Sequence, residues 1–323
     1  MSSQDTASRW LFRIATTLLV GFSAGLILAC SQLTESIAES PAPESEIYAP
    51  PEEIPLIKGP ISQDGLQAIF ATPDISTGRH RIAFALTSQT GLVKAPSATV
   101  QSFHKPQGAL LDDPAQTALA LFHPFPLVER GLYVTKLTFD QPGEWTIRAT
   151  TLGNDGLPKK ATLSFEVPEE THAPSVGEPA IPSRSRTTED VERLSQLTTG
   201  SMQDEDLYQV SIADAIQSRL PTVIVMASPA FCINAVCGPQ VEVLRDLKNE
   251  FSGQANFIHV DYYDNPEEIQ GDLGRAVLSP VAREWRLPSA EWSFVIDRDG
   301  VISGRFEGFT PLEELRQALK RVL

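Results

Sequence analysis

The sequence predicts a multidomain fold, an all-β sandwich followed by an α/β domain, on three observations. Residues 58–168 alternate apolar and polar residues between turn signals, a pattern typical of antiparallel strands with one buried face. Residues 205–323 alternate continuous apolar runs with helical stretches, which is typical of strands that are buried on both faces. Two stretches with many prolines and glutamates, residues 31–57 and 169–204, flank the first domain. Their composition predicts a disordered tether and a linker.

The N-terminal residues have the composition of an export signal. Arg9 and Arg13 precede an uncharged apolar stretch, residues 14–28, and the sequence Ile-Leu-Ala-Cys ends at Cys30. This ending resembles the bacterial lipobox, which implies cleavage before Cys30 and acylation of that cysteine. We therefore expect a signal peptide over residues 1–30 and a chain held by its acyl groups on the extracytoplasmic face of a cell membrane. The alternative is a plain membrane anchor in which Cys30 has no role.

Charge and cysteine content restrict the partners of the chain. The formal net charge is -15, so electrostatic attraction to nucleic acids or to anionic lipids is not expected. Export places the chain in a compartment where disulfides form and persist. Of the three cysteines, Cys30 is assigned to the lipid anchor, which leaves Cys232 and Cys237. A disulfide between these two is the expected resting state.

The first domain is predicted to be an antiparallel β-sandwich. Its strands are expected at residues 80–86, 132–139, 144–149 and 163–167. The order of Tyr133, Phe139 and Trp145 resembles the late strands of bacterial immunoglobulin-like modules. No motif that carries chemistry is visible in this domain, so a binding or spacer role fits best. The histidines of this domain lie far apart in the sequence, so no metal site is expected there.

The second domain is predicted to alternate strands and helices. Strands are expected at residues 222–227, 256–262, 292–297 and 301–307, and helices at residues 212–220, 240–251, 275–285 and 312–322. Because Asp299-Gly300 favours positive φ angles, we expect a type I′ turn between the last two strands. From the first strand on, the order is β-α-β-α-β-β-α.

This order and several motifs resemble the thioredoxin superfamily. The motifs are the strand TVIVMA ahead of the cysteines, Cys237-Gly238-Pro239, and Trp285-Arg286-Leu287-Pro288 ahead of the final hairpin. The resemblance implies a thioredoxin-like fold for residues 205–323 and thiol–disulfide exchange with the thiols or disulfides of exported proteins, without a cofactor or a metal. It also implies that Pro288 is cis and that Leu287 and Pro288 align the backbone of a bound substrate.

The spacing of the cysteines departs from the superfamily, whose Cys-Gly-Pro-Cys motif places the two sulfurs closer together in sequence. Here four residues separate Cys232 from Cys237. In one register Cys237-Gly238-Pro239-Gln240 overlays the motif, Gln240 replaces the second cysteine, and Cys232 comes from an inserted loop. In the other register Cys232 takes the first position, as in some peroxiredoxins.

Physical chemistry favours the first register. Proline suits the first turn of a helix, because its missing N–H would be unpaired there anyway, so Pro239 marks the helix start. The positive end of the helix dipole then stabilises a thiolate at Cys237. We therefore expect Cys237 to be the nucleophile and Cys232 to be the resolving cysteine.

A general base is not evident from the sequence. The strand ahead of the cysteines contains no carboxylate, which leaves Glu291 or a water molecule as candidates. The acidic run from Asp261 to Glu268 is expected to be a solvated loop.

Other interpretations of the cysteine pair stay open. A structural disulfide would make the protein a non-catalytic binding or scaffolding lipoprotein, although closing so short a loop stabilises a fold little. Thiolates also bind copper(I), but the nearest histidine, His259, is expected to be a buried sheet residue. A peroxidase is disfavoured, because Ser228 is one residue out of step with the motif that precedes a peroxidatic cysteine at Cys232.

Overall fold

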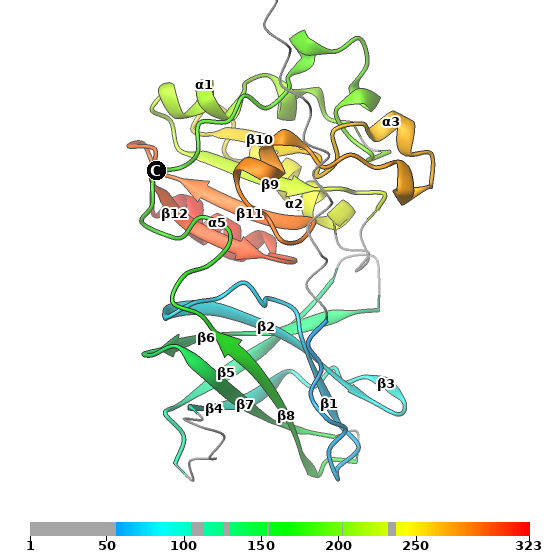
Figure 1. Cartoon of the computed structure of the whole chain (residues 1–323), viewed down its shortest axis with the longest axis vertical. Helices are drawn as coiled ribbons and strands as arrows, with labels where there is room; N and C mark the ends of the chain where they lie inside the picture. Colours follow the sequence, from blue (N-terminus) through cyan, green and yellow to red (C-terminus); the bar gives the residue numbers. More distant parts are fainter. Residues whose placement is uncertain (1–55, 105–112, 126–128, 154, 202, 232–236) are drawn as a thin grey trace, which may run out of the picture. The chain divides into compact units, whose positions relative to one another are not determined.

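Two β-sheets form the framework of the protein in a computed structural model (Figure 1). The structure describes residues 56–104, 113–125, 129–153, 155–201, 203–231 and 237–323. Cys30, the signal peptide and nearly all of the tether lie outside these ranges, as does Cys232. The lipid anchor therefore stays a prediction.

The first sheet contains eight strands, and all of its strand pairs are antiparallel. The strands are β1 (Gln67–Phe70), β2 (Gly78–Ser88), β3 (Gly91–Leu92), β4 (Ser97–His104), β5 (Gln116–Pro124), β6 (Gly131–Phe139), β7 (Gly143–Leu152) and β8 (Pro158–Val167). Their order across the sheet is β1-β2-β6-β5-β4-β7-β8, and β3 pairs with β2. The four strands that the sequence predicts correspond to β2, β6, β7 and β8.

All eight strands belong to one continuous sheet, whereas the sequence predicts a sandwich. The unpredicted strands β4 and β5 explain the difference, because β5 pairs with β6 and β4 pairs with β7. The ends of the sheet approach each other at Gly59, where a Cβ would lie 1.8 Å from the carbonyl oxygen of Thr162 in β8. The sheet is therefore nearly closed, and the immunoglobulin-like resemblance is not confirmed.

The interior of this sheet is filled by side chains that alternate along the strands. Its large buried residues are Phe70, Phe84, Tyr133, Phe139, Trp145 and Phe165. Two of them carry polar groups that find backbone acceptors: Tyr133 Oη donates to Val93 at 3.2 Å, and Trp145 Nε1 donates to Gln141 at 3.0 Å. The core is mostly apolar, and the polar groups of Tyr133 and Trp145 are satisfied; the buried hydroxyl of Ser102 in β4 has no partner among the described residues.

Residues 169–204 connect the two sheets, but a large part of this segment is packed rather than free. The amide of Gly177 donates to the carbonyl of Ile302 at 2.8 Å, and the amide of Ala180 donates to that of Gly300 at 2.8 Å. Ser183 Oγ accepts a hydrogen bond from Trp285 Nε1 at 3.0 Å. The composition suggested a linker because most of the buried residues here are alanine, serine or threonine, which do not form an apolar pattern.

The second sheet contains four strands in the order β10-β9-β11-β12. Their bounds are β9 (Thr222–Ala227), β10 (Asn256–Val260), β11 (Glu291–Ile296) and β12 (Ile302–Glu307). β9 and β10 are parallel, and β11 is antiparallel to both β9 and β12. Every residue of β9 is buried, as predicted for a strand that is covered on both faces. β10, also predicted to be a buried strand, is buried except at its two half-buried end residues, and β11 is buried throughout.

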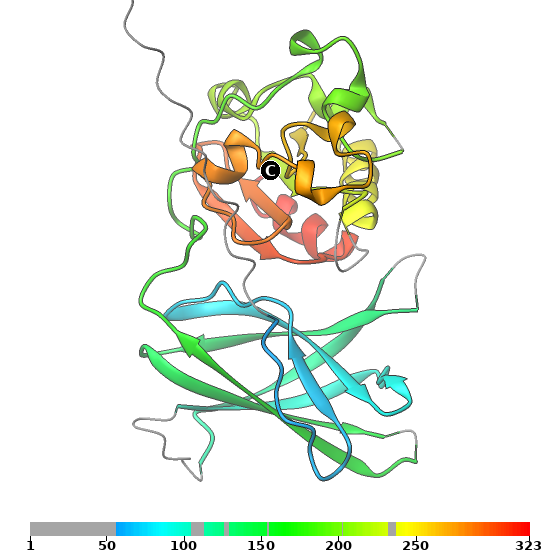
Figure 2. The same cartoon turned by 45° about the vertical axis from the view of Figure 1, so that its right-hand side comes forward.

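Helices cover both faces of this sheet (Figures 1 and 2). α2 (Cys237–Glu250) and α5 (Leu312–Lys320) pack on the face that carries Val225 and Val295. α1 (Ile212–Gln217) and α4 (Pro280–Glu284) pack on the opposite face. The predicted order is confirmed, with α3 (Pro266–Ile269) and α4 in place of the one longer helix expected at residues 275–285. Within the described ranges, no helix has the length and apolar character needed to span a bilayer.

The final hairpin is confirmed, but its turn type differs from the prediction. Gly300 has a φ of 79°, whereas Arg298 and Asp299 are not among the residues with positive φ. A type I′ turn requires positive φ at both central residues. The amide of Asp297 donates to the carbonyl of Val301 at 2.9 Å, which closes a loop of three residues with glycine in the left-handed position.

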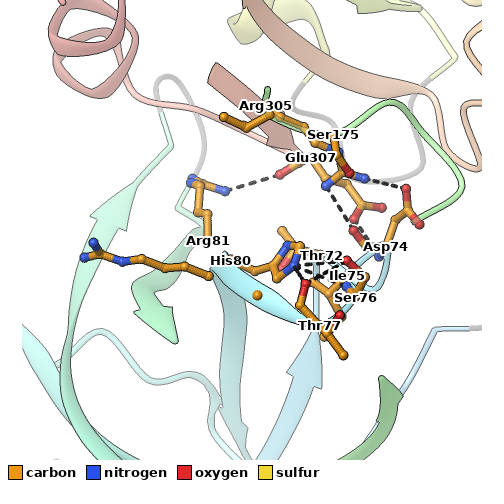
Figure 3. Close-up of a pocket in the computed structure, with 13 residues that line it drawn as sticks. Thr72, Asp74, Ile75, Ser76, Thr77, His80, Arg81, Ser175, Arg305 and Glu307 are labelled. Carbon is orange, nitrogen blue, oxygen red and sulfur yellow. Dashed lines mark hydrogen bonds and ion pairs between the residues drawn. The ribbon is translucent and has the colours of Figure 1, made fainter. Parts of the chain in front are cut away.

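A buried ion pair joins the loop after β1 to β12. Arg305 Nη2 lies 2.5 Å from Asp74 Oδ2, and the two side chains are only 8% and 1% exposed. Arg305 also donates to the carbonyls of Asp74 and Pro174, each at 3.0 Å, and its guanidinium lies 4.7 Å from the ring centroid of Trp292. The pair lies beside a cavity of about 250 Å³ (Figure 3). Both sheets belong to one compact unit, residues 48–323, so the predicted multidomain arrangement is not confirmed.

Removal of one partner of this ion pair should destabilise the fold strongly. Asp74→Ala leaves the guanidinium of Arg305 buried without its counter-charge, which we expect to lower the free energy of unfolding by about 3 kcal/mol. Chemical denaturation followed by tryptophan fluorescence measures the loss. Lys94→Met is the control, because Lys94 pairs with Glu129 on the surface and should change stability by about 0.5 kcal/mol or less. Equal effects of the two substitutions would contradict this assignment.

Candidate functional site

Helix α2 begins at Cys237, as the position of Pro239 predicts. The helix follows β9, and Gly238 lies close to the chain that leaves this strand, since a Cβ on Gly238 would be 3.9 Å from the carbonyl oxygen of Pro229. Of Cys237 the structure describes the helix position alone, and Cys232 lies outside the described residues. The pairing of the two cysteines therefore stays a prediction.

Gln240 occupies the place of the second cysteine in the favoured register, and it is fully buried. Its Oε1 accepts a hydrogen bond of 2.8 Å from the amide of Thr310, which is also fully buried. Residues three apart on a helix are neighbours on its surface, so Gln240 and the backbone position of Cys237 share one face of α2. A side chain that the sequence marks only as a departure from the motif thus fixes the first turn of the helix.

Glu291 is a buried carboxyl group on the same face of the sheet. It begins β11, pairs with Ala227 at the end of β9, and is 4% exposed. Because alternate residues of a strand share a face, Glu291 lies on the side of Val295, which packs with α2 and α5. Burial raises the pKa of Glu291 to about 8, the nearby charge of Glu307 adds to this rise, and the charge of Arg81 opposes it.

Three buried side chains on this face have polar atoms without a hydrogen-bond partner among the described residues. The atoms are Gln240 Nε2, both carboxyl oxygens of Glu291, and Ser293 Oγ. The short segment from Gly308 to Thr310 connects them, because Gly308 N donates to the carbonyl of Glu291 at 2.9 Å and Thr310 N donates to Gln240. Buried unpaired polar groups are rare and often mark functional positions.

Asp261 is a second buried acid, at the carboxyl end of β10, and the sequence-based assignment to a solvated loop is wrong for this residue. It is 3% exposed, and burial raises its pKa to about 6. Its carboxylate accepts hydrogen bonds from the amide and hydroxyl of Thr199, at 2.7 and 2.9 Å, and from the amide of Tyr263 at 3.1 Å. The position at the end of a buried strand was the sequence signal that could have shown its burial.

The network around Asp261 reaches the segment that precedes Cys232. Thr199 Oγ1 lies 3.1 Å from Ser228 Oγ and accepts a hydrogen bond of 3.1 Å from the amide of Ala230. Since parallel strands end at the same edge of a sheet, Ser228 after β9 and Asp261 after β10 meet there. The network holds the start of the cysteine segment against the edge of the sheet.

His259 is a satisfied sheet histidine, as predicted. It is 1% exposed, and burial lowers its pKa to about 4, so it is neutral. Its Nε2 donates to the carbonyl of Ala227 at 3.0 Å, and its Nδ1 accepts a hydrogen bond of 2.6 Å from Tyr208 Oη. Both ring nitrogens are therefore occupied, which argues against His259 as a copper ligand.

Leu287 and Pro288 follow α4 on the opposite face of the sheet. The side chain of Leu287 is buried, and its carbonyl accepts a hydrogen bond of 3.2 Å from Tyr262 Oη. Arg286, directly before it, has a φ of 50°, a conformation that costs energy for a residue other than glycine. Pro288 is half-buried. Contact of Leu287 with a substrate would therefore involve its backbone, and this role stays a prediction.

A cavity of about 670 Å³ lies beside the first half of α2. Its lining includes Thr199, Pro229, Ala230, Gly238, Val241 and Arg245. The lining thus comes from the described residues on either side of the cysteine segment. In the described part of the chain, no three His, Cys, Asp or Glu side chains gather as metal ligands would.

Comparison with known proteins finds similarity only among solved structures. The sequence matches no family model and no curated protein. Among solved structures, the chain is similar to a thiol:disulfide interchange protein, a thioredoxin family protein from Chlorobium tepidum TLS, with a TM-score of 0.30 and 14% sequence identity. The match covers 46% of this chain and 99% of the other. A similarity of this size does not assign the chain to a family.

The buried carboxyl of Glu291 should make stability fall as pH rises. Its pKa of about 8 in the folded state lies above its value in the unfolded chain, about 4.3. Below the pKa of the unfolded chain, Glu291 is protonated in both states and does not lower the free energy of unfolding. As pH rises from that value towards the pKa of the folded state, the free energy of unfolding falls. Glu291→Gln should remove this loss and be more stable than wild type by roughly 2–4 kcal/mol at pH about 8.5, with little difference at pH about 4.

Denaturation of both proteins at the two pH values measures this difference. Glu284→Gln, at an exposed position in α4, is the matched control and should leave the pH dependence unchanged. If Glu291→Gln had the same effect at both pH values, the folded protein would not hold a proton on Glu291.

Proposed function

We propose that this protein is a membrane-anchored, extracytoplasmic thiol–disulfide oxidoreductase that acts on exported proteins through Cys237 and Cys232. The observation that carries the proposal is that α2 begins at Cys237, with Gly238 and Pro239 in its first turn. Backbone N–H groups at a helix start stabilise a thiolate. This is the property that a nucleophilic cysteine requires.

The exchange transfers two electrons through one mixed disulfide. The Cys237 thiolate attacks one sulfur of a partner disulfide, the partner S–S bond breaks, and the second partner sulfur leaves as a thiolate that takes up a proton. The thiolate of Cys232 then attacks Cys237 Sγ, which releases the first partner sulfur and leaves Cys232 and Cys237 oxidised. The reverse sequence oxidises a partner dithiol. Leu287 and Pro288 would hold the partner backbone beside the sulfurs.

Two buried acids can exchange protons in this cycle. Glu291 lies on the face of the sheet that α2 covers, and Asp261 supports the segment before Cys232. Their raised pKa values, about 8 and about 6, lie in the range where a group both takes up and releases protons near neutral pH. We assign Glu291 to the proton of Cys237, because Gln240 and Glu291 are tied to the same short segment.

The redox state of the pair tests the proposal directly. In glutathione buffers, the Cys232–Cys237 disulfide should have a reduction potential above about -300 mV, the value below which structural disulfides typically lie. Cys232→Ser should accumulate a mixed disulfide with an exported protein, whereas Cys232→Ser/Cys237→Ser should trap none. If the potential lies far below this value and the protein does not reduce insulin, the disulfide is structural and the protein is a binding or scaffolding lipoprotein.

The trapping experiment also separates the two registers of the motif. If Cys237 is the nucleophile, only Cys232→Ser traps a partner, because Cys237 forms the mixed disulfide and cannot be resolved. If trapping instead requires Cys237→Ser, Cys232 is the nucleophile, and the assignment of roles is reversed.

The lipid anchor is tested by fractionation. With acyl chains on Cys30, the wild-type chain should sediment with membranes, and Cys30→Ala should abolish the covalent lipid signal in metabolic labelling with a fatty acid. Cys232→Ser is the control and should be labelled like wild type. Labelling that persists in Cys30→Ala would exclude Cys30 as the attachment site.

A further inference from the structure

The eight-stranded sheet contributes a side chain that reaches the supports of the candidate redox site. We propose that Arg81 of β2 is a positioning residue for Cys237: it fixes the segment Gly308–Thr310, which in turn holds the first turn of α2 through Gln240. The inference rests on the proposed function, and it gives the first sheet a role in the reaction rather than that of a spacer.

Arg81 is buried and binds three groups at once. Its side chain is 6% exposed, and Nε lies 3.0 Å from both carboxyl oxygens of Glu314 in α5. Nη1 donates to the carbonyl of Glu307 at 3.2 Å (Figure 3). Nη2 donates to the carbonyl of Phe309 at 2.9 Å. The planar guanidinium can bind these acceptors together because its donors are fixed in a fork, an arrangement that lysine cannot reproduce.

The segment Gly308–Thr310, to which Arg81 donates a hydrogen bond, is packed on both sides. Gly308 has a φ of 71°, and a Cβ on it would lie 3.6 Å from the carbonyl oxygen of Ala71. Phe309 is 4% exposed and meets Phe125 edge to face, with ring centroids 4.9 Å apart. Arg81 of β2 and Phe125, the residue after β5, therefore contact this segment through a hydrogen bond and through an aromatic pair.

The same segment supports the site on its other side. Gly308 N donates to the carbonyl of Glu291, and Thr310 N donates to Gln240 Oε1, at 2.9 and 2.8 Å. Gln240 lies one turn after Cys237, so a shift of the segment would move the helix start. Displacements of about 1 Å at such supports are enough to change reactivity strongly.

Arg81 also contributes its charge to the site. Two charged groups act on the Glu291 carboxyl: Arg81, which favours its ionised form, and Glu307, which opposes it. Glu314 on α5 offsets part of the charge of Arg81, and His123 on β5 lies within range of both. Loss of Arg81 would thus make the ionised form of Glu291 still less favourable. Glu307 does not supply a full charge there near neutral pH, because burial raises its own pKa to about 8.

The test uses the full chain with Cys30→Ala and Cys232→Ser, so that Cys237 is the only one of the three cysteines left. The rate of alkylation by iodoacetamide against pH gives the midpoint of thiolate formation. We expect Arg81→Met to move this midpoint upwards by at least about 0.5 pH unit, a threefold loss of thiolate below the midpoint. Arg79→Met, at an exposed position two residues earlier on β2, is the matched control and should leave the midpoint unchanged.

Gln240→Met tests the route by which Arg81 acts. It removes the acceptor of the Thr310 amide and should shift the midpoint in the same direction. If Arg81 acts through this hydrogen bond, the double variant shifts the midpoint by less than the sum of the two single shifts. Strict additivity would overturn the route through Gln240.

An unchanged midpoint in Arg81→Met would overturn the inference, even if the variant were less stable. A residue with a purely structural role would lower the melting temperature without changing the pKa of the Cys237 thiol. If Arg81→Met fails to fold, Arg81→Lys takes its place: it keeps the charge, loses the fork, and must still shift the midpoint. Alkylation reads the Cys237 thiol whether or not the wild type exchanges disulfides. A shifted midpoint together with an inactive wild type would therefore contradict the proposed function alone.

Discussion

The hydrogen bond from the amide of Thr310 to Gln240 Oε1 is the constraint on which the candidate site depends. It ties the first turn of α2 to the end of the hairpin formed by β11 and β12. Because both groups are fully buried, the bond forms where the local dielectric is low. Loss of the bond would leave a buried polar group without a partner, which costs stability. The start of a helix frays easily when it lacks such support. Here the helix start is fixed at Cys237, the nucleophile of the proposed reaction.

The candidate site contains two buried carboxyl groups whose pKa values are raised. Glu291 begins β11 and Asp261 directly follows β10, and burial raises the pKa of each above its ordinary value. Asp261 is well hydrogen-bonded, whereas Glu291 has no side-chain partner among the described residues. An ionisable group that is buried without partners costs stability, and such a cost is commonly retained where the group takes part in a reaction. The stability of the fold comes from elsewhere, chiefly from the apolar side chains buried on the two sheets.

The sequence predicted the α/β half of the chain well because its signals are local. The run Thr222–Ala227 is short and contains β-branched residues, which favours a covered strand, and Pro239 favours a helix start at its own position. The first sheet was predicted only in part, since β4 (Ser97–His104) mixes serine and threonine with apolar residues, and the closure of the sheet depends on long-range pairing. The sequence did not show that Gln240 holds the first turn of α2, that Asp261 is buried, or that Arg81 binds the segment Gly308–Thr310. Their roles arise from contacts between segments far apart in the chain, which no local pattern encodes.

The thiol pKa of Cys237 tests the central claim most directly. In the full chain with Cys30→Ala and Cys232→Ser, the ultraviolet absorbance of the thiolate can be followed against pH. A fixed helix start predicts a midpoint of about 7.5 or lower, in the range of reactive cysteines. A midpoint at or above about 8.5, the value of an unperturbed thiol, would contradict the account, because the start of α2 would then do nothing to activate Cys237.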